Sequence, residues 1–404
     1  MFPPLAYLRW IEGRPAAADH DLGSSDLRRT ADGDPADPVP ARLAGLSPPD
    51  DDITLRESVA AEYGLDPSRV LLTAGATHAG FLAAATATDL ARERATPVDA
   101  VDTARTADTT DAADAADPTT AADPWALVEA PGYEPLVETP RGAGSRVARF
   151  RRPGPTADLD PERVAAAAAD LPGPLAHATV TNRHNPTGGM ADRGRLAETA
   201  AVVDDHDGYL LVDEVYAPYT VDDDDARTGG GRDGAADAFG GPTAAGQPAT
   251  VTIGSLTKFH GLGGLKIGWL TGPPAFIERA RTVERHVPAL SAPAAALARR
   301  FFAHRDALVA DARDHCRWNH DLLAAFLAER DDLSGVVPPG SPFALLEHDR
   351  VDGDAVGEAA HDAGVLVVPG RFFGADEGVR VSLGRDPEAC AAALDALGAV
   401  LDGL

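Results

Sequence analysis

The stretch SLTKFHGLGGLKIGW, residues 255–269, contains both lysines of the chain, Lys258 and Lys266. It continues the apolar run ATVTIGSL (249–256), which is typical of a buried parallel strand. Lys258 therefore stands just past a predicted strand end, with the hydroxyl of Ser255 close by. Every other permanently charged basic residue of the chain is arginine. We therefore interpret Lys258 as a nucleophilic amine and Lys266 as a point charge for phosphate. The alternative is that both are ordinary surface lysines.

Three more short apolar runs precede this stretch, and each ends in a polar or glycine-rich turn: WALVEA (125–130), HATVTN (177–182) and YLLVDEV (209–215). Segments of helical composition alternate with them, namely PERVAAAAADL (161–171) and GRLAETAAVVDDH (194–206). Alternating strands and helices predict an α/β fold with a mostly parallel central sheet. In such sheets ligands bind at the carboxyl ends of the strands.

The chain has 404 residues, of which 44% are hydrophobic, and this is enough for two cores. We expect a large domain at 47–285 and a smaller α+β domain assembled from 1–46 and 286–404, with the site between them. Two stretches, 96–122 and 222–248, are rich in Ala, Asp, Thr or Gly. We interpret both as acidic surface insertions within the large domain.

The formal net charge of −27 argues against nucleic acid and anionic membranes as partners, because both are bound through basic side chains. A strongly acidic surface is tolerable at molar salt, where the Debye length falls to about 3 Å. The composition therefore favours a halophilic protein. A GC-rich coding bias is the alternative, although it explains arginine use better than the excess of carboxylates.

Cys316 and Cys390 are too few for a disulfide framework, and we expect two buried, inert thiols. No window has the roughly 20 apolar residues that a membrane span needs, and the start MFPPLAYLRWIEG does not resemble a leader. These features predict a soluble cytoplasmic protein.

Asp213 lies at the end of the apolar run YLLVD, where an ionised carboxylate is costly unless a cation pairs with it. A protonated pyridine nitrogen is one such cation. A turn-capping aspartate, a metal ligand or a nucleotide-site carboxylate are alternatives. The nucleotide interpretation lacks the phosphate-binding loop GxxxxGK[ST] that it requires.

Three segments together carry a resemblance to a known family: TNRHNPTGG (181–189), DEVY (213–216) and SLTKFHGLGGLKIGW (255–269). From about residue 53 to its end, the chain resembles the aminotransferase class I/II family of fold-type I enzymes, which use pyridoxal phosphate (PLP). The resemblance implies PLP as the cofactor and Lys258 as its Schiff-base residue. It also implies a homodimer, since sites of this family lie at a subunit interface.

The resemblance assigns a role to each cofactor-binding position. Asp213 would pair with the pyridine nitrogen, Asn185 and Tyr216 would hold the ring oxygen, and Tyr133 of EAPGYEPL would stack on the ring. The phosphate would be held by the turn TAGATHAG (73–80) and by the lysine segment, through Gly75, Ala76, Thr77, Ser255 and Lys266. Lys266 replaces the usual Arg, so the charge stays while the bidentate fork is lost.

On the substrate side, Arg380 of GVRVSLG matches the arginine that holds the substrate carboxylate in this family, together with Asn185. Gly23 of DLGSSDL would lie where the N-terminal segment covers the substrate. Arg371 of VVPGRFFG would either contact the substrate side chain or face solvent. We also expect a desolvated, cation-bearing site to keep the released Lys258 neutral, so that it can act as a base.

The expected reaction is transfer of the amino group of an L-amino acid to a 2-oxo acid. A PLP-dependent lyase or decarboxylase of the same fold is the main alternative, because the motifs do not choose which substrate bond breaks. A non-catalytic PLP-binding regulator and a sugar-nucleotide aminotransferase are further alternatives. The first would need a DNA-binding extension, and the second would not need Arg380.

Two weaker signals predict no additional site. GLGGLKIG has Lys266 where a dinucleotide-binding turn needs its third glycine. Four histidines lack paired metal-ligand spacing, so we expect no metal site and interpret them as solvated or supporting residues: His177, His184, His206 and His260.

Overall fold

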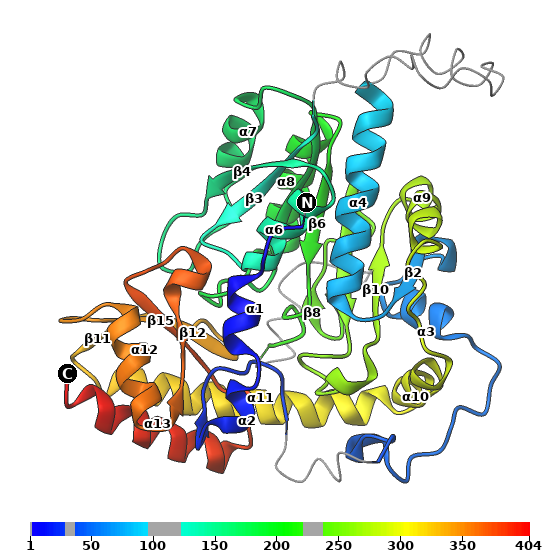
Figure 1. Ribbon diagram of the computed structural model, residues 1–404. Coiled ribbons are helices and arrows are strands. Elements are labelled where there is room, and N and C mark those ends of the chain that lie inside the picture. Colours follow the sequence, from blue (N-terminus) through cyan, green and yellow to red (C-terminus); the bar gives the residue numbers. More distant parts are fainter. Residues whose placement is uncertain (1, 29–36, 96–122, 221–236) are drawn as a thin grey trace, which may run out of the picture.

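The computed structural model describes residues 2–28, 37–95, 123–220 and 237–404, and it is built around a seven-stranded sheet (Figure 1). The strand order is β2-β10-β9-β6-β5-β3-β4. Neighbouring strands from β9 to β4 are parallel, whereas β10 is antiparallel to both β9 and β2. The strands are β2 (Val70–Thr73), β3 (Trp125–Ala130), β4 (Arg146–Arg151), β5 (Leu175–Thr181), β6 (Tyr209–Asp213), β9 (Thr250–Ser255) and β10 (Gly268–Thr271). The predicted, mostly parallel sheet is therefore confirmed.

Helices cover both faces of this sheet. On one face α4 (Ala76–Ala95) contacts α6 (Glu134–Gly142) and α9 (Pro274–Glu284), and on the other α7 (Pro161–Ala169) packs against α8 (Arg193–Asp204). Alternate residues of β6 serve the two faces, since Leu210 and Val212 join the α7–α8 core while Leu211 joins the α4–α9 core. Burial on both faces explains why the strands are continuous apolar runs.

A second, antiparallel sheet of order β11-β12-β15-β14 is formed by the C-terminal part. Its strands are β11 (Leu333–Gly335), β12 (Phe343–His348), β14 (Val368–Pro369) and β15 (Gly378–Ser382), and the nearby helices are α11 (Arg305–Ala328), α12 (Gly353–Asp362) and α13 (Pro387–Leu401). The N-terminal segment joins this part, because β1 (His20–Asp21) pairs with β13 (Val365–Leu366). This matches the predicted mixed small domain, while its boundaries stay a prediction.

The remaining helices lie at the edges: α1 (Ala6–Ile11), α2 (Arg14–Ala17), α3 (Leu55–Glu62) and α10 (Ala292–Ala303), with 3-10 turns at Ala41–Leu43, Pro67–Arg69, Gly263–Leu265 and Gly370–Phe373. Helix starts make use of the acidic composition. The side chains of Asp160, Asp192 and Asp352 each accept a hydrogen bond from a backbone N–H in the first turn of α7, α8 and α12. Part of the carboxylate excess therefore has a local structural role.

The prediction for 222–248 is wrong for its described half. The hairpin of β7 (Asp237–Ala238) and β8 (Gly241–Pro242) leads into buried residues, and Phe239 is only 2% exposed within an aromatic cluster with Trp269 and Phe301. The many glycine and aspartate residues of the stretch predict a loop, and the single buried ring of Phe239 does not change this pattern. The stretch 96–122 and the first half of 222–248 lie outside the described residues.

Both cysteines are buried and unpaired, as expected, and burial raises the pKa of each thiol to about 12. Among the described residues, no helix combines the length and the apolar character that crossing a membrane requires.

Candidate active site

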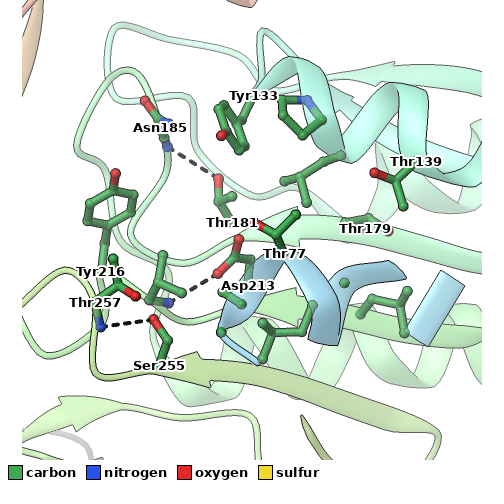
Figure 2. Close-up of a pocket in the computed structure, with 18 of the residues that line it drawn as sticks. Thr77, Tyr133, Thr139, Thr179, Thr181, Asn185, Asp213, Tyr216, Ser255 and Thr257 are labelled. Carbon is green, nitrogen blue, oxygen red and sulfur yellow. Dashed lines mark hydrogen bonds between the residues drawn. The ribbon is translucent and has the colours of Figure 1, made fainter. Parts of the chain in front are cut away.

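A cavity of about 410 Å³ opens at the carboxyl ends of β5, β6 and β9, beside the start of α4. Eleven of the twelve predicted site residues line it: Gly75, Ala76, Thr77, Tyr133, Asn185, Asp213, Tyr216, Ser255, Lys258, Lys266 and Arg380. The twelfth residue, Gly23, lies behind Arg380, and its carbonyl oxygen accepts a hydrogen bond from that guanidinium. Figure 2 shows how side chains from separate strands and loops face this space.

Lys258 lies in the turn after β9, and its Nζ is 5.7 Å from the ring centre of Tyr216. The N-terminal segment holds this turn in place, because the backbone N–H of Leu27 donates a hydrogen bond to the carbonyl oxygen of Lys258 over 3.0 Å. Burial lowers the pKa of Lys258, but Tyr216, Asp26 and Tyr7 oppose it and the net pKa is raised. In the protein alone the lysine is therefore held as a cation, whereas the expectation of a neutral amine concerns the lysine after its release from a bound cofactor and stays a prediction. The reason for the raised pKa is that anionic or ionisable oxygens surround Lys258 on several sides.

Asp213 ends β6 and is buried with its carboxylate at the cavity. The hydrogen bond described for it comes from the backbone N–H of Val215, over 3.2 Å (Figure 2). Burial raises the pKa of Asp213 to about 6, and the nearby Glu129 adds to this. The carboxylate would therefore be stabilised by a cation placed in the cavity.

Asn185 and Tyr216 occupy the same end of the cavity. The Asn185 side chain accepts a hydrogen bond through Oδ1 from Arg380 (2.8 Å), and its backbone N–H donates to the Thr181 hydroxyl over 3.2 Å. The Tyr216 phenol oxygen lies 2.6 Å from the hydroxyl of Ser25. Because Arg380 holds Oδ1, the orientation of the amide is fixed, and its Nδ2 is the donor that it can offer to a ligand.

The start of α4 forms a narrow cup. Gly75 has a φ of +83°, and a Cβ on Gly268 would come within 2.6 Å of the Gly75 carbonyl carbon and 2.9 Å of the Ala76 nitrogen. Only glycines let β10 and the helix start approach this closely. The first turn of α4 contains no acidic residue, and Lys266 lies next to it, also with a positive φ of 53°. Free N–H groups at a helix start together with a lysine favour a phosphate.

Arg380 of β15 is buried, and its guanidinium is held on several sides. Besides Asn185 it donates to the carbonyl oxygen of Gly23 (2.9 Å) and to the Tyr7 phenol oxygen (3.5 Å). Its Nε has no hydrogen-bond partner within the described ranges. A buried guanidinium with unused donor capacity is suited to bind a carboxylate.

A buried ion pair supports this end of the sheet. Glu129 and Arg152 are joined over 2.6 Å, with side-chain exposures of 0% and 1%. The other carboxylate oxygen of Glu129 accepts from the backbone N–H (2.8 Å) and the hydroxyl (2.5 Å) of Thr181, which in turn holds Asn185. The pair thus positions the Asn185 turn.

Sequence reasoning missed Ser25, Tyr7 and Glu129, as well as Asp26. Ser25 and Tyr7 line the cavity, and Asp26 is a buried carboxylate near Lys258. Burial raises the pKa of Asp26, but the positive charges of Lys258 and Arg28 together outweigh this effect, so the net pKa is lowered. The run DLGSSDL contained the one usable signal, since two hydroxyls and a carboxylate follow its glycine.

The positions of Arg371 and the four histidines decide between the alternatives given for them. Arg371 does not line the cavity; it is exposed, pairs with Asp354 and lies over Phe372, so the solvent-facing alternative holds. His177, His184 and His260 are buried, which fits the supporting alternative, and His177 lines the cavity, whereas His206 is exposed, which fits the solvated alternative. Within the described part of the chain, no group of three or more His, Cys, Asp or Glu residues is placed to hold a metal ion.

The donor set fits PLP. The glycine cup and Lys266 suit its phosphate, Asp213 suits its ring nitrogen, and Lys258 Nζ suits its aldehyde carbon. Tyr133 is the N-cap residue of α6 and lines the cavity, as a ring that stacks on the cofactor would have to. Burial raises the pKa of Tyr133, so its phenol stays neutral.

Residues 42–397 match the family model described as aminotransferase class I and II. The aspartate/prephenate aminotransferase of Thermus thermophilus is 29% identical over 251 residues, which is 60% of each chain. The histidinol-phosphate aminotransferase of Haloferax volcanii is 28% identical over 209 residues, or 52% of this chain and 51% of the relative. The chain thus spans about half to three-fifths of the length of these curated relatives.

Solved structures agree over nearly the whole chain. A PLP-dependent aminotransferase from Streptococcus suis has a TM-score of 0.75 at 18% identity and covers 100% of this chain and 98% of its own. The aspartate aminotransferase of Thermus thermophilus with maleate has a TM-score of 0.69 at 22% identity, covering 99% and 97%. At these identities the likeness shows the fold, and it confirms the predicted fold class.

Proposed function

The chain belongs to the aminotransferase class I and II family, and we propose that it transfers the amino group of an L-amino acid to a 2-oxo acid with PLP as its cofactor. Relatives named as aminotransferases of aspartate or prephenate, of histidinol phosphate, and of arginine and pyruvate support this reaction class. A similar structure is described as a PLP-dependent cyclase, so the fold alone does not choose the reaction.

The observation that carries the proposal is the meeting of Lys258, Asp213 and Arg380 in one cavity. The first is an amine that can bind an aldehyde, the second a buried carboxylate suited to a pyridine nitrogen, and the third a buried guanidinium suited to a substrate carboxylate. These three side chains come from the turn after β9, from β6 and from β15, and each has the chemistry that transamination needs.

When bound, PLP supplies a conjugated ring that withdraws electrons from the substrate Cα. Asp213 would hold a proton at the ring nitrogen, because its buried carboxylate is stabilised by an adjacent cation. Lys258 would bind the cofactor through Nζ and, once released by the incoming amine, would move the Cα proton with the same nitrogen.

The other cavity residues bind and orient. Asn185 Nδ2 and the Tyr216 phenol would hold the ring oxygen, and Tyr133 would stack on the ring. Arg380 would bind the substrate carboxylate with Asn185, beside the backbone of Gly23. The phosphate would be held by the helix start and the lysine segment, through Gly75, Ala76, Thr77, Ser255 and Lys266.

We further propose a cytoplasmic homodimer adapted to high salt. The net charge of −27 and the near absence of lysine support the adaptation, and two similar relatives come from Haloferax volcanii and Halobacterium salinarum. Large apolar side chains exposed in the described part of the chain are further support, since a second copy would cover some of them: Phe2, Ile53, Val287, Leu290, Trp318 and Val336. Light scattering in molar salt would give the mass of a dimer, and a monomer would contradict this part.

The test uses the two lysines, because each provides the control for the other. The protein is loaded with PLP and reduced with borohydride, and the modified peptide is identified by mass spectrometry. We expect PLP on Lys258, its loss in Lys258→Ala with at least about a thousand-fold fall in transamination, and its retention in Lys266→Arg. PLP retained covalently by Lys258→Ala would overturn the assignment.

The same protein distinguishes transamination from the lyase and decarboxylase alternatives. Given an amino acid without an acceptor, an aminotransferase releases one 2-oxo acid per site and stops, and a 2-oxo acid restarts it. Continuous release of ammonia or carbon dioxide would support the alternatives instead.

A further inference from the structure

The short helix α1 (Ala6–Ile11) joins the two parts of the molecule beside the cavity. In Figure 1 it lies next to α6 at its start and leads through α2 to β1, which pairs with β13 of the C-terminal part. Its first N–H groups are capped by a side chain of α6: Glu134 accepts from the backbone N–H of Ala6 (2.9 Å) and of Tyr7 (2.7 Å). Because Glu134 directly follows Tyr133, the helix is tied to the wall of the active site.

Tyr7 is the one buried residue of α1, and its side chain faces the cavity. Its ring contacts aromatic rings from both parts of the molecule, at 5.7 Å from Tyr133, 5.6 Å from Phe372 and 5.9 Å from Phe373 between ring centres. Its phenol oxygen accepts a hydrogen bond from Arg380 over 3.5 Å. The ring is thus fixed by packing, with the hydroxyl beside the guanidinium.

We propose that Tyr7 is a second ligand of the substrate α-carboxylate, shared with Arg380, and that Glu134 is the positioning residue that holds it there. The inference rests on the proposed function, in which Arg380 binds that carboxylate. It adds a residue from the N-terminal helix to the substrate site.

The hydrogen-bonding chemistry favours this role. A phenol that accepts from a guanidinium keeps its own proton free to donate, and the best acceptor in this place is a carboxylate bound to the same guanidinium. The Arg380 guanidinium already serves Asn185 and Gly23, so a second donor would complete the coordination of a carboxylate with two oxygens. Removal of one hydrogen bond to a charged group typically costs about 1.5–3 kcal/mol, or roughly ten- to a hundred-fold in affinity.

The test measures equilibrium binding of two unreactive probes, 3-phenylpropanoate and its neutral amide, to the PLP-loaded protein in molar salt by calorimetry. The unaltered protein should bind the acid more tightly than the amide. Tyr7→Phe keeps the ring packing and removes only the hydroxyl. We expect this substitution to lower the affinity for the acid by about ten-fold or more and the affinity for the amide much less. Equal weakening of both probes, or no weakening, would overturn the proposal.

A double-mutant cycle separates direct contact from an effect through the arginine. In an Arg380→Lys background, Tyr7→Phe should still weaken the acid at least several-fold if the phenol touches the carboxylate. No further loss in that background would show that Tyr7 acts only by holding Arg380, and would overturn direct contact. If the unaltered protein shows no preference for the acid, or Arg380→Lys leaves acid binding unchanged, the carboxylate role of Arg380 fails, and with it the inference.

Glu134 is tested with a neighbour on the same helix. Glu134→Ala should increase amide hydrogen exchange in residues 5–11 and weaken the acid about as much as Tyr7→Phe. Glu138→Ala, whose carboxylate pairs with Arg141, is the matched control and should change neither measurement. Unchanged acid binding in Glu134→Ala, with α1 exchanging faster, would contradict the positioning role.

Discussion

The phenol oxygen of Tyr216 and the hydroxyl of Ser25 lie 2.6 Å apart in a buried contact between residues 191 positions apart in the chain. The same segment is held a second time, because Tyr219 donates to the carbonyl oxygen of Ser25 over 2.8 Å. Ser25 thereby connects the N-terminal segment to the strand end that carries Asp213. The orientation of Tyr216 thus depends on a residue far from its own motif.

Ser25→Ala should weaken PLP binding by roughly two- to ten-fold, since one hydrogen bond is typically worth about 0.5–1.5 kcal/mol. Fluorescence titration of the cofactor-free protein with PLP measures this effect. In a Tyr216→Phe background the substitution should have no further effect, because its partner is already absent. Ser24→Ala is the control. An equal loss of PLP affinity in that variant would mean that either substitution disturbs the whole segment, and that the contact of Ser25 with Tyr216 has no specific role.

The ion pair of Glu129 and Arg152 predicts a large stability effect of one-sided removal. Arg152→Met leaves Glu129 buried without its cation, which should lower the free energy of unfolding by about 3–5 kcal/mol in chemical denaturation. Adding Glu129→Gln should recover part of the loss. The exposed pair of Arg195 and Glu198 is the control, and Arg195→Met should change stability by no more than about 0.5 kcal/mol.

The sequence predicted four of the seven strands of the large sheet from their apolar runs and, through the motifs of the family it resembles, eleven residues that line the cavity. An apolar run reports burial on two faces of a sheet, and a motif reports a turn at its carboxyl edge. Tyr7 and Glu129 were not predictable in this way, because their roles depend on partners brought together only by folding. Arg380 and Tyr7, for example, are 373 positions apart. For Ser25 the polar run DLGSSDL was a signal, but it did not reveal the partner Tyr216. The aromatic anchor Phe239 was missed because its neighbours are glycine and aspartate, which predict a loop.

Glu214 predicts a pH dependence of stability. Burial raises its pKa to about 8, although it accepts hydrogen bonds from the backbone N–H of Ala244 and from Thr243. A carboxyl group with a raised pKa binds its proton more tightly in the folded state than in the unfolded state. Its contribution to stability is therefore present below about pH 4.5 and is lost as the pH rises toward 8.

Glu214→Gln should remove this slope, which is at most about 1.4 kcal/mol per pH unit for one group. Denaturation of both proteins without cofactor between pH 4.5 and 8 measures the difference. The variant should gain stability relative to the unaltered protein as the pH rises. A difference that is constant across this range would show that Glu214 ionises normally in the folded protein.

Asp213→Asn addresses the role of the buried carboxylate directly. Asparagine keeps the volume and a hydrogen-bond acceptor for Val215, but it cannot carry the charge that would hold a proton at the ring nitrogen. Loss of a buried charge partner costs about 3 kcal/mol or more, so the half-reaction with an amino acid should slow by roughly a hundred-fold or more. Stopped-flow measurement of that single half-reaction separates this effect from substrate binding.

A cofactor analogue methylated at the ring nitrogen provides the decisive control, because its positive charge does not depend on a protein carboxylate. The analogue should restore much of the lost rate in Asp213→Asn, and the unaltered protein should not gain from it. A variant that stays slow with the analogue would indicate that Asp213 acts through geometry rather than charge. A variant as fast as the unaltered protein with ordinary PLP would show that the raised pKa of Asp213 reflects burial alone and serves no catalytic purpose.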